Sequence, residues 1–197
     1  MSLLIKICGL RDEQHVAAAV VAGAGALGFV FAESYRRVTP QQARSISDAV
    51  PRSVKRVAVM LHPANDEWQR VLQQFGPDVL QTDAGDFAGL EIPASVERWP
   101  VYREGQPVPD VAGNWVYEGP RSGQGETVDW SAAARLARSG GMILAGGLGP
   151  ENVAAAIRRT RPSGVDVSSG VESAPGKKDS RLIKEFISAA RAAEKEL

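Results

Sequence analysis

Short apolar segments alternate with helical patterns along nearly the whole chain of 197 residues. Eight of these segments have the length and apolar content of strands: 3–8, 26–31, 55–61, 78–82, 99–103, 114–118, 141–146 and 164–168. Repeated alternation of strand and helix indicates parallel strands joined by right-handed crossovers. Eight such units predict a closed barrel, whereas five or six would predict an open, doubly wound sheet.

Helical patterns of uneven length separate the strand segments. The clear ones cover 12–23, 39–50, 63–76, 131–140, 149–160 and 179–196. Asp12 and Thr39 are expected to be N-caps, and Pro150 and Glu151 are expected in the first turn of their helix. Little helical pattern follows the fourth and fifth strand segments, and the length is at the low end of the barrel range of roughly 200 residues and more. We therefore expect an α/β fold with one domain over 1–197, a (β/α)8 TIM barrel with some abbreviated helices.

The composition excludes several classes of protein. Lys+Arg and Asp+Glu are both 23, so no basic field indicates a nucleic-acid or membrane partner. No apolar stretch reaches the ~18 residues of a membrane span, and the N-terminal apolar run is too short for a signal peptide. The single cysteine excludes an intrachain disulfide, and His15 and His62 have no metal-ligand spacing. We expect a cytoplasmic protein that acts on a small molecule without metal or cofactor, and the oligomeric state stays open.

Two glycine-containing loops follow the seventh and eighth strand segments. The first, LAGGLGPENV, contains Gly146 and Gly147, and the second, DVSSGVE, contains Ser168, Ser169 and Gly170. Backbone amides beside glycine bind anions closely, and loops after these two strands commonly hold a substrate phosphate in barrels. Either loop alone is more typical of an ordinary strand–helix turn, but the pair at adjacent strand ends favours a phosphate site. Neither loop has the spacing of a dinucleotide or Walker motif.

Cys8 ends the first strand segment. By strand parity, Lys6 and Cys8 point to one side, and Ile5 and Ile7 point to the other. A thiol whose pKa is lowered by neighbouring cations can act as a base or nucleophile, although a lone cysteine is more often a buried structural residue. No histidine is placed to activate Cys8 as a protease-type nucleophile.

Three charged side chains follow other strand segments. Arg36 lies in the loop after the second strand, where a guanidinium suits a carboxylate, although surface arginines are common. Glu118 ends the sixth strand at a pocket rim, where a carboxyl group can act as general acid. Asp129, in TVDW, is more typical of a helix N-cap. Together with the two loops, these residues predict an isomerase or lyase that acts on a sugar phosphate.

Several segments resemble the phosphoribosylanthranilate isomerase family of tryptophan biosynthesis. KICGL, GFVF…SYRRVTPQQA, VDW, LAGGLGPENV and DVSSGVESAPGKKD occur in that family's order and at about its spacing. The resemblance covers nearly the whole chain and implies a (β/α)8 barrel. It also implies an Amadori rearrangement of N-(5-phosphoribosyl)anthranilate to 1-(2-carboxyphenylamino)-1-deoxy-D-ribulose 5-phosphate, by general acid and base catalysis.

The resemblance also implies roles for particular residues. Cys8 would be the general base, and Arg36 would hold the anthranilate carboxylate. Asp166 would orient the substrate or the loop. The phosphate would bind to Gly146, Gly147, Ser168, Ser169 and Gly170.

The chain departs from the family's pattern at two strand ends. The family's acid is an aspartate that closes the sixth strand, and NWVYEGP places Glu118 there instead, with Asp129 as the runner-up acid. The fourth strand keeps Gln81 but has Asp83 near the place of a histidine. Two alternatives remain: a related phosphosugar isomerase of histidine biosynthesis, and a catalytically silent phosphosugar-binding barrel. The stretch 120–126 is expected to be a long loop, and its glycines suit a lid.

Overall fold

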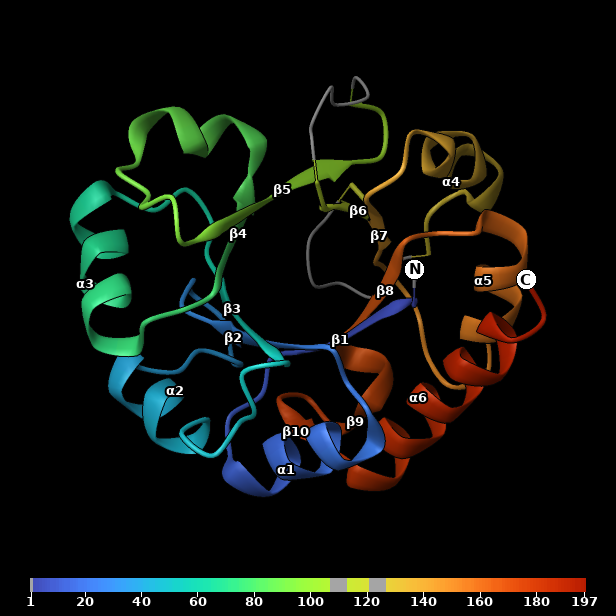
Figure 1. Cartoon of the computed structure of the whole chain (residues 1–197), viewed down its shortest axis with the longest axis horizontal. Helices are drawn as coiled ribbons and strands as arrows, with labels where there is room; N and C mark the ends of the chain where they lie inside the picture. Colours follow the sequence, from blue (N-terminus) through green and yellow to red (C-terminus); the bar gives the residue numbers. More distant parts are fainter. Residues whose placement is uncertain (1, 107–112, 121–126) are drawn as a thin grey trace.

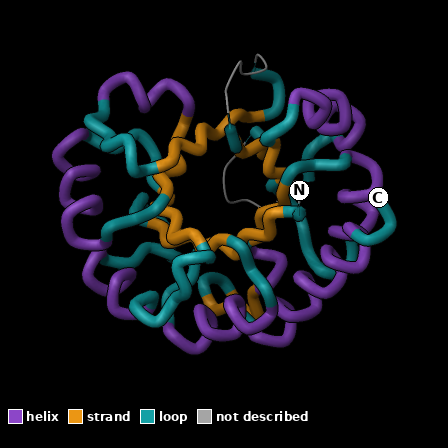
Figure 2. Tube along the Cα trace, viewed as in Figure 1, coloured by secondary structure: helices purple, strands orange, loops and turns teal. Residues whose placement is uncertain are grey.

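The computed structural model describes residues 2–106, 113–120 and 127–197. Eight parallel strands form a closed barrel surrounded by helices (Figure 1 and Figure 2). The strands are β1 (Leu4–Cys8), β2 (Ala26–Val30), β3 (Lys55–Val59), β4 (Val79–Asp83), β5 (Glu97–Arg103), β6 (Trp115–Glu118), β7 (Met142–Leu144) and β8 (Gly164–Val167). Because β1 pairs with both β2 and β8, the sheet has no free edge. The predicted (β/α)8 fold is therefore confirmed.

Helices of different lengths connect the strands. They are α1 (Glu13–Ala22), α2 (Pro40–Ile46), α3 (Asn65–Phe75), α4 (Trp130–Leu136), α5 (Val153–Thr160) and α6 (Ser180–Glu194). Only a 3-10 helix, η1 (Ala84–Gly89), follows β4, and the described residues between β5 and β6 contain no helix. The expectation of abbreviated helices after these two strands agrees with this part of the structure. The expected loop over 120–126 lies almost entirely outside the described residues, and so does its suggested role as a lid.

Local hydrogen bonds explain where several helices begin. The Asp12 carboxylate accepts a hydrogen bond from the His15 backbone at 2.9 Å and caps α1. The Thr39 hydroxyl accepts one from the Gln42 backbone at 3.1 Å and caps α2, whose first residue is Pro40. Both predicted N-caps are confirmed.

The expected first turn of the fifth helix is wrong. The helix α5 begins at Val153, so Pro150 and Glu151 lie in a turn that precedes it. The reason is the Asn152 side chain, which accepts a hydrogen bond from the Gly149 backbone and donates one to the Gly147 carbonyl. These bonds satisfy the loop backbone in a non-helical conformation.

Two apolar clusters hold the barrel together. The larger one lies between the strands and the outer helices. The smaller one fills the barrel interior and includes Val57, Val79, Trp99, Val116 and Ile143. The interior is therefore packed, as expected for an eight-stranded barrel, and polar groups gather at the C-terminal strand ends. Among the described residues, no helix is long and apolar enough to cross a membrane.

Candidate active site

A cavity of about 250 Å³ opens at the C-terminal end of the barrel. The ends of all eight strands, or the residues directly after them, contribute to its wall. Of the residues predicted for the site, the wall contains Cys8, Arg36, Glu118, Gly146, Gly147, Asp166, Ser168 and Ser169. Gly170 and Asp129 lie outside this wall. The fold thus brings most of the predicted site residues to one cavity.

Cys8 lies beside a buried ion pair on the barrel wall. The Lys6 Nζ atom is fully buried and donates a hydrogen bond to Asp166 Oδ2 at 2.8 Å. This pair exists because Lys6 and Asp166 are directly opposite each other on β1 and β8. Burial works against the Lys6 charge, but Asp166 and Cys8 raise the pKa of the lysine, so it stays protonated.

The Cys8 thiol has opposing electrostatic influences. Burial raises its pKa, and the nearby Asp166 carboxylate acts in the same direction. Lys6 and Lys178 oppose this rise because they stabilise a thiolate. The thiol therefore lies in an environment where two cations favour its ionised form and burial disfavours it.

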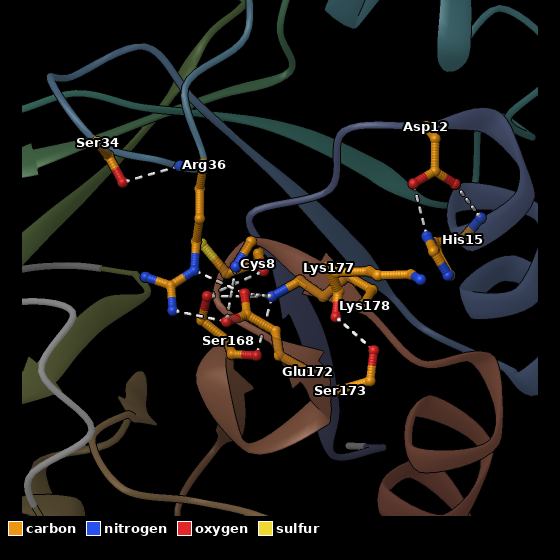
Figure 3. A network of polar contacts seen from close by, with 11 residues as sticks. Cys8, Asp12, His15, Ser34, Arg36, Ser168, Glu172, Ser173, Lys177 and Lys178 are labelled. Atoms are coloured by element: carbon orange, nitrogen blue, oxygen red, sulfur yellow. Dashed lines mark hydrogen bonds and ion pairs between the residues drawn. The ribbon is translucent and has the colours of Figure 1, made fainter.

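Arg36 is held by a protein carboxylate. Its Nε atom donates to Glu172 Oε1 at 2.7 Å, and its Nη2 atom donates to Glu172 Oε2 at 3.0 Å. A guanidinium has five N–H donors, so this bidentate pair leaves the Nη1 edge for another acceptor. Figure 3 shows that edge pointing away from Glu172, and Arg36 lines the cavity. The expected contact with a substrate carboxylate is therefore limited to this second edge.

The loop after β7 turns on two glycines with positive φ angles. Gly146 and Gly147 have φ angles of 91° and 60°, in the left-handed region that favours glycine. Asn152 fixes the loop through its bonds to Gly147 and Gly149. Successive amides in such turns can point toward one anion, so the loop suits a phosphate group.

The loop after β8 packs directly on the loop after β7. A side chain at Gly170 would overlap the carbonyl oxygen of Leu148, which belongs to the loop after β7. Gly170 thus has a packing role next to the predicted phosphate loops, and it does not line the cavity.

We expect Gly170→Ala to weaken phosphate binding because the added methyl group must push the two loops apart. The KM of a phosphorylated substrate should rise about tenfold or more, with a smaller change in kcat. Gly89→Ala is the matched control, since a side chain there would meet nothing within 4 Å. Unchanged KM in Gly170→Ala would contradict the close packing of the loops at the site.

A network of charged side chains lies in the part of the cavity wall that β4, β5 and β6 form, across from the glycine loops. Arg103 is directly opposite Glu118 on adjacent strands, and its Nη2 atom lies 3.3 Å from Glu118 Oε1. Its Nη1 atom contacts Asp83 Oδ2 at 2.5 Å. His62 extends the network, 3.7 Å from Asp83 and 2.9 Å from Asp86. Glu118 is therefore held in place by an arginine on the neighbouring strand.

Asp129 has a different environment from Glu118. It is exposed, and its carboxylate accepts a hydrogen bond from the Ser131 backbone at 2.7 Å, capping α4. This agrees with the alternative interpretation of Asp129 as an N-cap. Between these two carboxylates, only Glu118 faces the cavity.

Two buried acceptors in the cavity wall have no hydrogen-bond partner among the described residues. They are Gln81 Oε1 on β4 and Asp166 Oδ1 on β8. Both side chains are buried, at 5% and 8% exposed. A buried acceptor without a donor costs free energy, so this pair suits a ligand that carries hydroxyl groups.

The described residues contain no group of three or more His, Cys, Asp or Glu that could hold a metal ion.

Several residues of the site had no assigned role from sequence. Lys6, Gln81 and Arg103 lie in expected strand segments, but no partner was predicted for them. Glu172 and Lys178 lie in the motif ESAPGKK, which forms a short hairpin of β9 (Glu172–Ala174) and β10 (Lys177–Lys178). The signal for this hairpin was the Pro-Gly turn, but strands of two or three residues are too short for a periodicity to indicate.

Comparison with known proteins gives a consistent result. The family model described as N-(5'-phosphoribosyl)anthranilate (PRA) isomerase matches residues 5–189. N-(5'-phosphoribosyl)anthranilate isomerase of Desulforamulus reducens is 40% identical, over 95% of this chain and 94% of that protein. The corresponding protein of Roseiflexus castenholzii is 38% identical, over 97% of this chain and 99% of its own.

Solved structures agree in architecture. The phosphoribosyl anthranilate isomerase of Thermus thermophilus has a TM-score of 0.84 and 30% identity, and the match covers 96% of this chain and 99% of that one. A phosphoribosyl anthranilate isomerase in complex with reduced 1-(o-carboxyphenylamino)-1-deoxyribulose 5-phosphate has a TM-score of 0.76 and 29% identity, with 97% and 100% covered.

Proposed function

The chain belongs to the phosphoribosylanthranilate isomerase family, and from this premise we propose how the side chains at its barrel mouth carry out that family's reaction. The protein is an isomerase of tryptophan biosynthesis, which rearranges N-(5'-phosphoribosyl)anthranilate to 1-(2-carboxyphenylamino)-1-deoxy-D-ribulose 5-phosphate. The observation that best supports the residue assignments is that Cys8, the open edge of Arg36 and the glycine loop at Gly146 line one cavity.

The two anionic groups of the substrate would bind at two separate places in the cavity. The phosphate binds to the backbone of the loops that contain Gly146, Gly147 and Ser168, where glycine allows close approach. The anthranilate carboxylate binds to the open Nη1 edge of Arg36, since a guanidinium suits a planar carboxylate. The sugar then lies between them, and its hydroxyl groups donate to Gln81 Oε1 and Asp166 Oδ1.

The reaction requires one acid and one base. Glu118 in its protonated form donates a proton to the ring oxygen of the ribose, and the ring opens to a Schiff base at C1'. The Cys8 thiolate then removes the proton from C2', which gives an enolamine that tautomerises to the ketone. Lys6 and Lys178 favour the thiolate electrostatically, and the buried Asp166–Lys6 pair holds the adjacent wall in place.

The partner of this site is a small phosphorylated molecule. We place the reaction in the cytoplasm, because its substrate is a phosphorylated metabolite with at least two negative charges. Among the described residues, the wall opposite the glycine loops offers no comparable site for a second phosphate, because Arg103 there contacts the Asp83 and Glu118 carboxylates. This favours the anthranilate substrate over the bisphosphorylated substrate of the related histidine-pathway isomerase.

The proposed function is tested with the purified protein and the fluorescent anthranilate substrate. We expect the fluorescence to decay in a protein-dependent way. The phosphoribosyl-formimino substrate of histidine biosynthesis serves as the comparison, and we expect little turnover of it. Binding of the reduced product analogue without any turnover would indicate a silent phosphosugar-binding barrel and would contradict the assignment.

A further inference from the structure

The hairpin β9–β10 places two charged side chains behind the cavity wall. It follows β8 and the short helix η3 (Ser169–Val171), and Glu172 and Lys178 lie at its base. Figure 3 shows that both side chains converge beside Arg36 and Ser168. Neither residue lines the cavity, so neither is expected to touch the substrate.

Hydrogen bonds connect these two residues to both anion-binding places. Glu172 binds Arg36 through both carboxylate oxygens, and its Oε1 atom also accepts a hydrogen bond from Lys178 Nζ at 2.8 Å. Lys178 Nζ in turn donates to the carbonyl oxygen of Ser168 at 2.8 Å and to its hydroxyl at 3.2 Å. The Ser168 hydroxyl donates to the Cys8 carbonyl at 3.1 Å. One chain of contacts thus joins Arg36, the phosphate loop and the backbone of Cys8.

The side chains that form this connection are buried. The side chains of Arg36, Glu172 and Lys178 are 6%, 5% and 1% exposed. Although burial opposes the charge, hydrogen bonds from Arg36 and Lys178 lower the pKa of Glu172 to about 2, so it stays ionised. Because all three charges are desolvated, each is stabilised by the partners that it contacts.

The tip of the hairpin also fixes the loop that carries Arg36. The Gly176 backbone donates a hydrogen bond to Glu172 Oε2 at 3.2 Å. A side chain at Gly176 would lie 3.1 Å from Tyr35, so the tip packs closely against this residue. The Arg36 guanidinium in turn lies over the Tyr35 ring, 4.3 Å from its centre. The hairpin therefore restrains Arg36 at two points: Gly176 packs on the preceding residue Tyr35, and Glu172 binds the guanidinium.

We propose that Glu172 and Lys178 are positioning residues that set the distance between the Arg36 guanidinium and the phosphate loop at Ser168. The proposal rests on the proposed function, in which these two groups bind the two ends of one substrate. Glu172 acts through Arg36, and Lys178 acts through Ser168. Their shared contact gives the two subsites a fixed separation on either side of Cys8.

A fixed distance between the two subsites strengthens binding only for a ligand that carries both the carboxylate and the phosphate. Such a ligand gains from preorganised subsites because it loses no further freedom when its second end binds. A ligand with one anion binds one subsite and does not depend on the distance to the other. The difference between these ligands distinguishes a positioning role from a general loss of stability.

The test compares the reduced product analogue, which carries both anions, with ribose 5-phosphate, which carries only the phosphate. In Glu172→Gln, we expect the dissociation constant of the reduced analogue to rise about 10- to 100-fold, measured by titration calorimetry. The dissociation constant of ribose 5-phosphate should stay within about twofold. The KM of the substrate should rise with the reduced analogue's dissociation constant, and kcat should fall by less.

Lys178→Met should show a different pattern, because this lysine holds the phosphate loop. Both ligands are expected to bind more weakly, by about tenfold or more. Lys177→Met is the matched control, since Lys177 is the preceding residue on β10 but is exposed, and we expect no change. If Glu172→Gln does not fold, Glu172→Asp keeps the charge with a shorter side chain and should give the same pattern at smaller size.

Equal weakening of both ligands in the Glu172 variants, or unchanged binding of the reduced analogue, would overturn the proposal. Circular dichroism and thermal unfolding identify variants whose loss comes from unfolding. Failure of this proposal is distinguishable from failure of the proposed function. Absence of turnover in the wild type contradicts the proposed function, whereas these binding measurements require no turnover. If the wild type binds neither ligand, both proposals are wrong.

Discussion

Replacement of Cys8 by alanine is expected to lower kcat about 10²- to 10⁴-fold, the range that a positioned general base contributes. The alanine variant has no group that can take the proton from C2' of the sugar. Lys6 lies close to Cys8, but Asp166 holds it in its protonated form, so it cannot replace the thiolate as a base. The loss is measured from the decay of substrate fluorescence under saturating conditions.

Binding separates this loss from a structural defect. Cys8→Ala should bind the reduced product analogue within about threefold of the wild type, because the subsites for carboxylate and phosphate remain in place. Cys8→Ser keeps the size of the side chain but has a far weaker base, so it should be nearly as inactive as the alanine variant. Turnover close to the wild-type rate in either variant would contradict the assignment of Cys8 as the base.

The pH dependence of the residual turnover of Glu118→Gln gives a second test of Cys8. Only the thiolate can accept a proton, and burial raises the pKa of Cys8 above its ordinary value. The competent fraction of the free enzyme is therefore small at neutral pH and grows as the pH rises. The wild type also needs protonated Glu118, whose amount changes with pH in the opposite direction, so the test uses the variant without this acid. Since kcat/KM reports groups of the free enzyme, the residual kcat/KM of Glu118→Gln should increase from about pH 6 to about pH 9. A flat profile over this range would contradict a thiolate base.

The strands and most helices could be predicted because their signals are local. An apolar run of five to seven residues, a capping Asp or Thr and a closing glycine are visible in a short window of sequence. Eight units of strand and helix then predict the closed barrel. From this fold, the position of Cys8 at the mouth follows directly, because it ends the first strand.

The partners of these residues could not be predicted in the same way. Arg36 and Glu172 are 136 positions apart in the sequence, and their contact depends on the path of a short hairpin that has no clear periodicity. Lys6 and Asp166 are 160 positions apart, and they meet because β1 and β8 close the barrel in one particular register. Such contacts follow from the complete fold and not from a local pattern.

The predicted start of α5 was wrong for a different reason. Pro150 and Glu151 are favourable residues for a first helical turn. The side chain of Asn152 competes with that turn, since it binds two backbone groups of the glycine loop. The local pattern was therefore misleading at a position where side-chain hydrogen bonds favour a non-helical backbone.

Glu118→Gln is expected to lower kcat about 10²- to 10⁴-fold, because the amide keeps the size of the side chain but cannot transfer a proton to the ring oxygen. Glu118 faces the cavity from the end of β6, and Arg103 holds it from the adjacent strand. Asp129→Asn is the matched control. Asp129 is exposed and caps α4, and asparagine is an equally good N-cap, so turnover should stay within about twofold. The opposite result, with loss in Asp129→Asn alone, would assign the acid to Asp129.

A shortened carboxylate at the same position tests how far the site depends on the length of Glu118. Glu118→Asp keeps the acid but withdraws it by one methylene, and Arg103 cannot follow because Asp83 holds its other nitrogen at 2.5 Å. A displacement of about 1 Å at a reacting group can cost about 10²-fold in rate. We therefore expect kcat of Glu118→Asp to fall well below the wild type but to exceed that of Glu118→Gln. Full activity in Glu118→Asp would contradict the idea that Arg103 and the longer carboxylate are matched to each other.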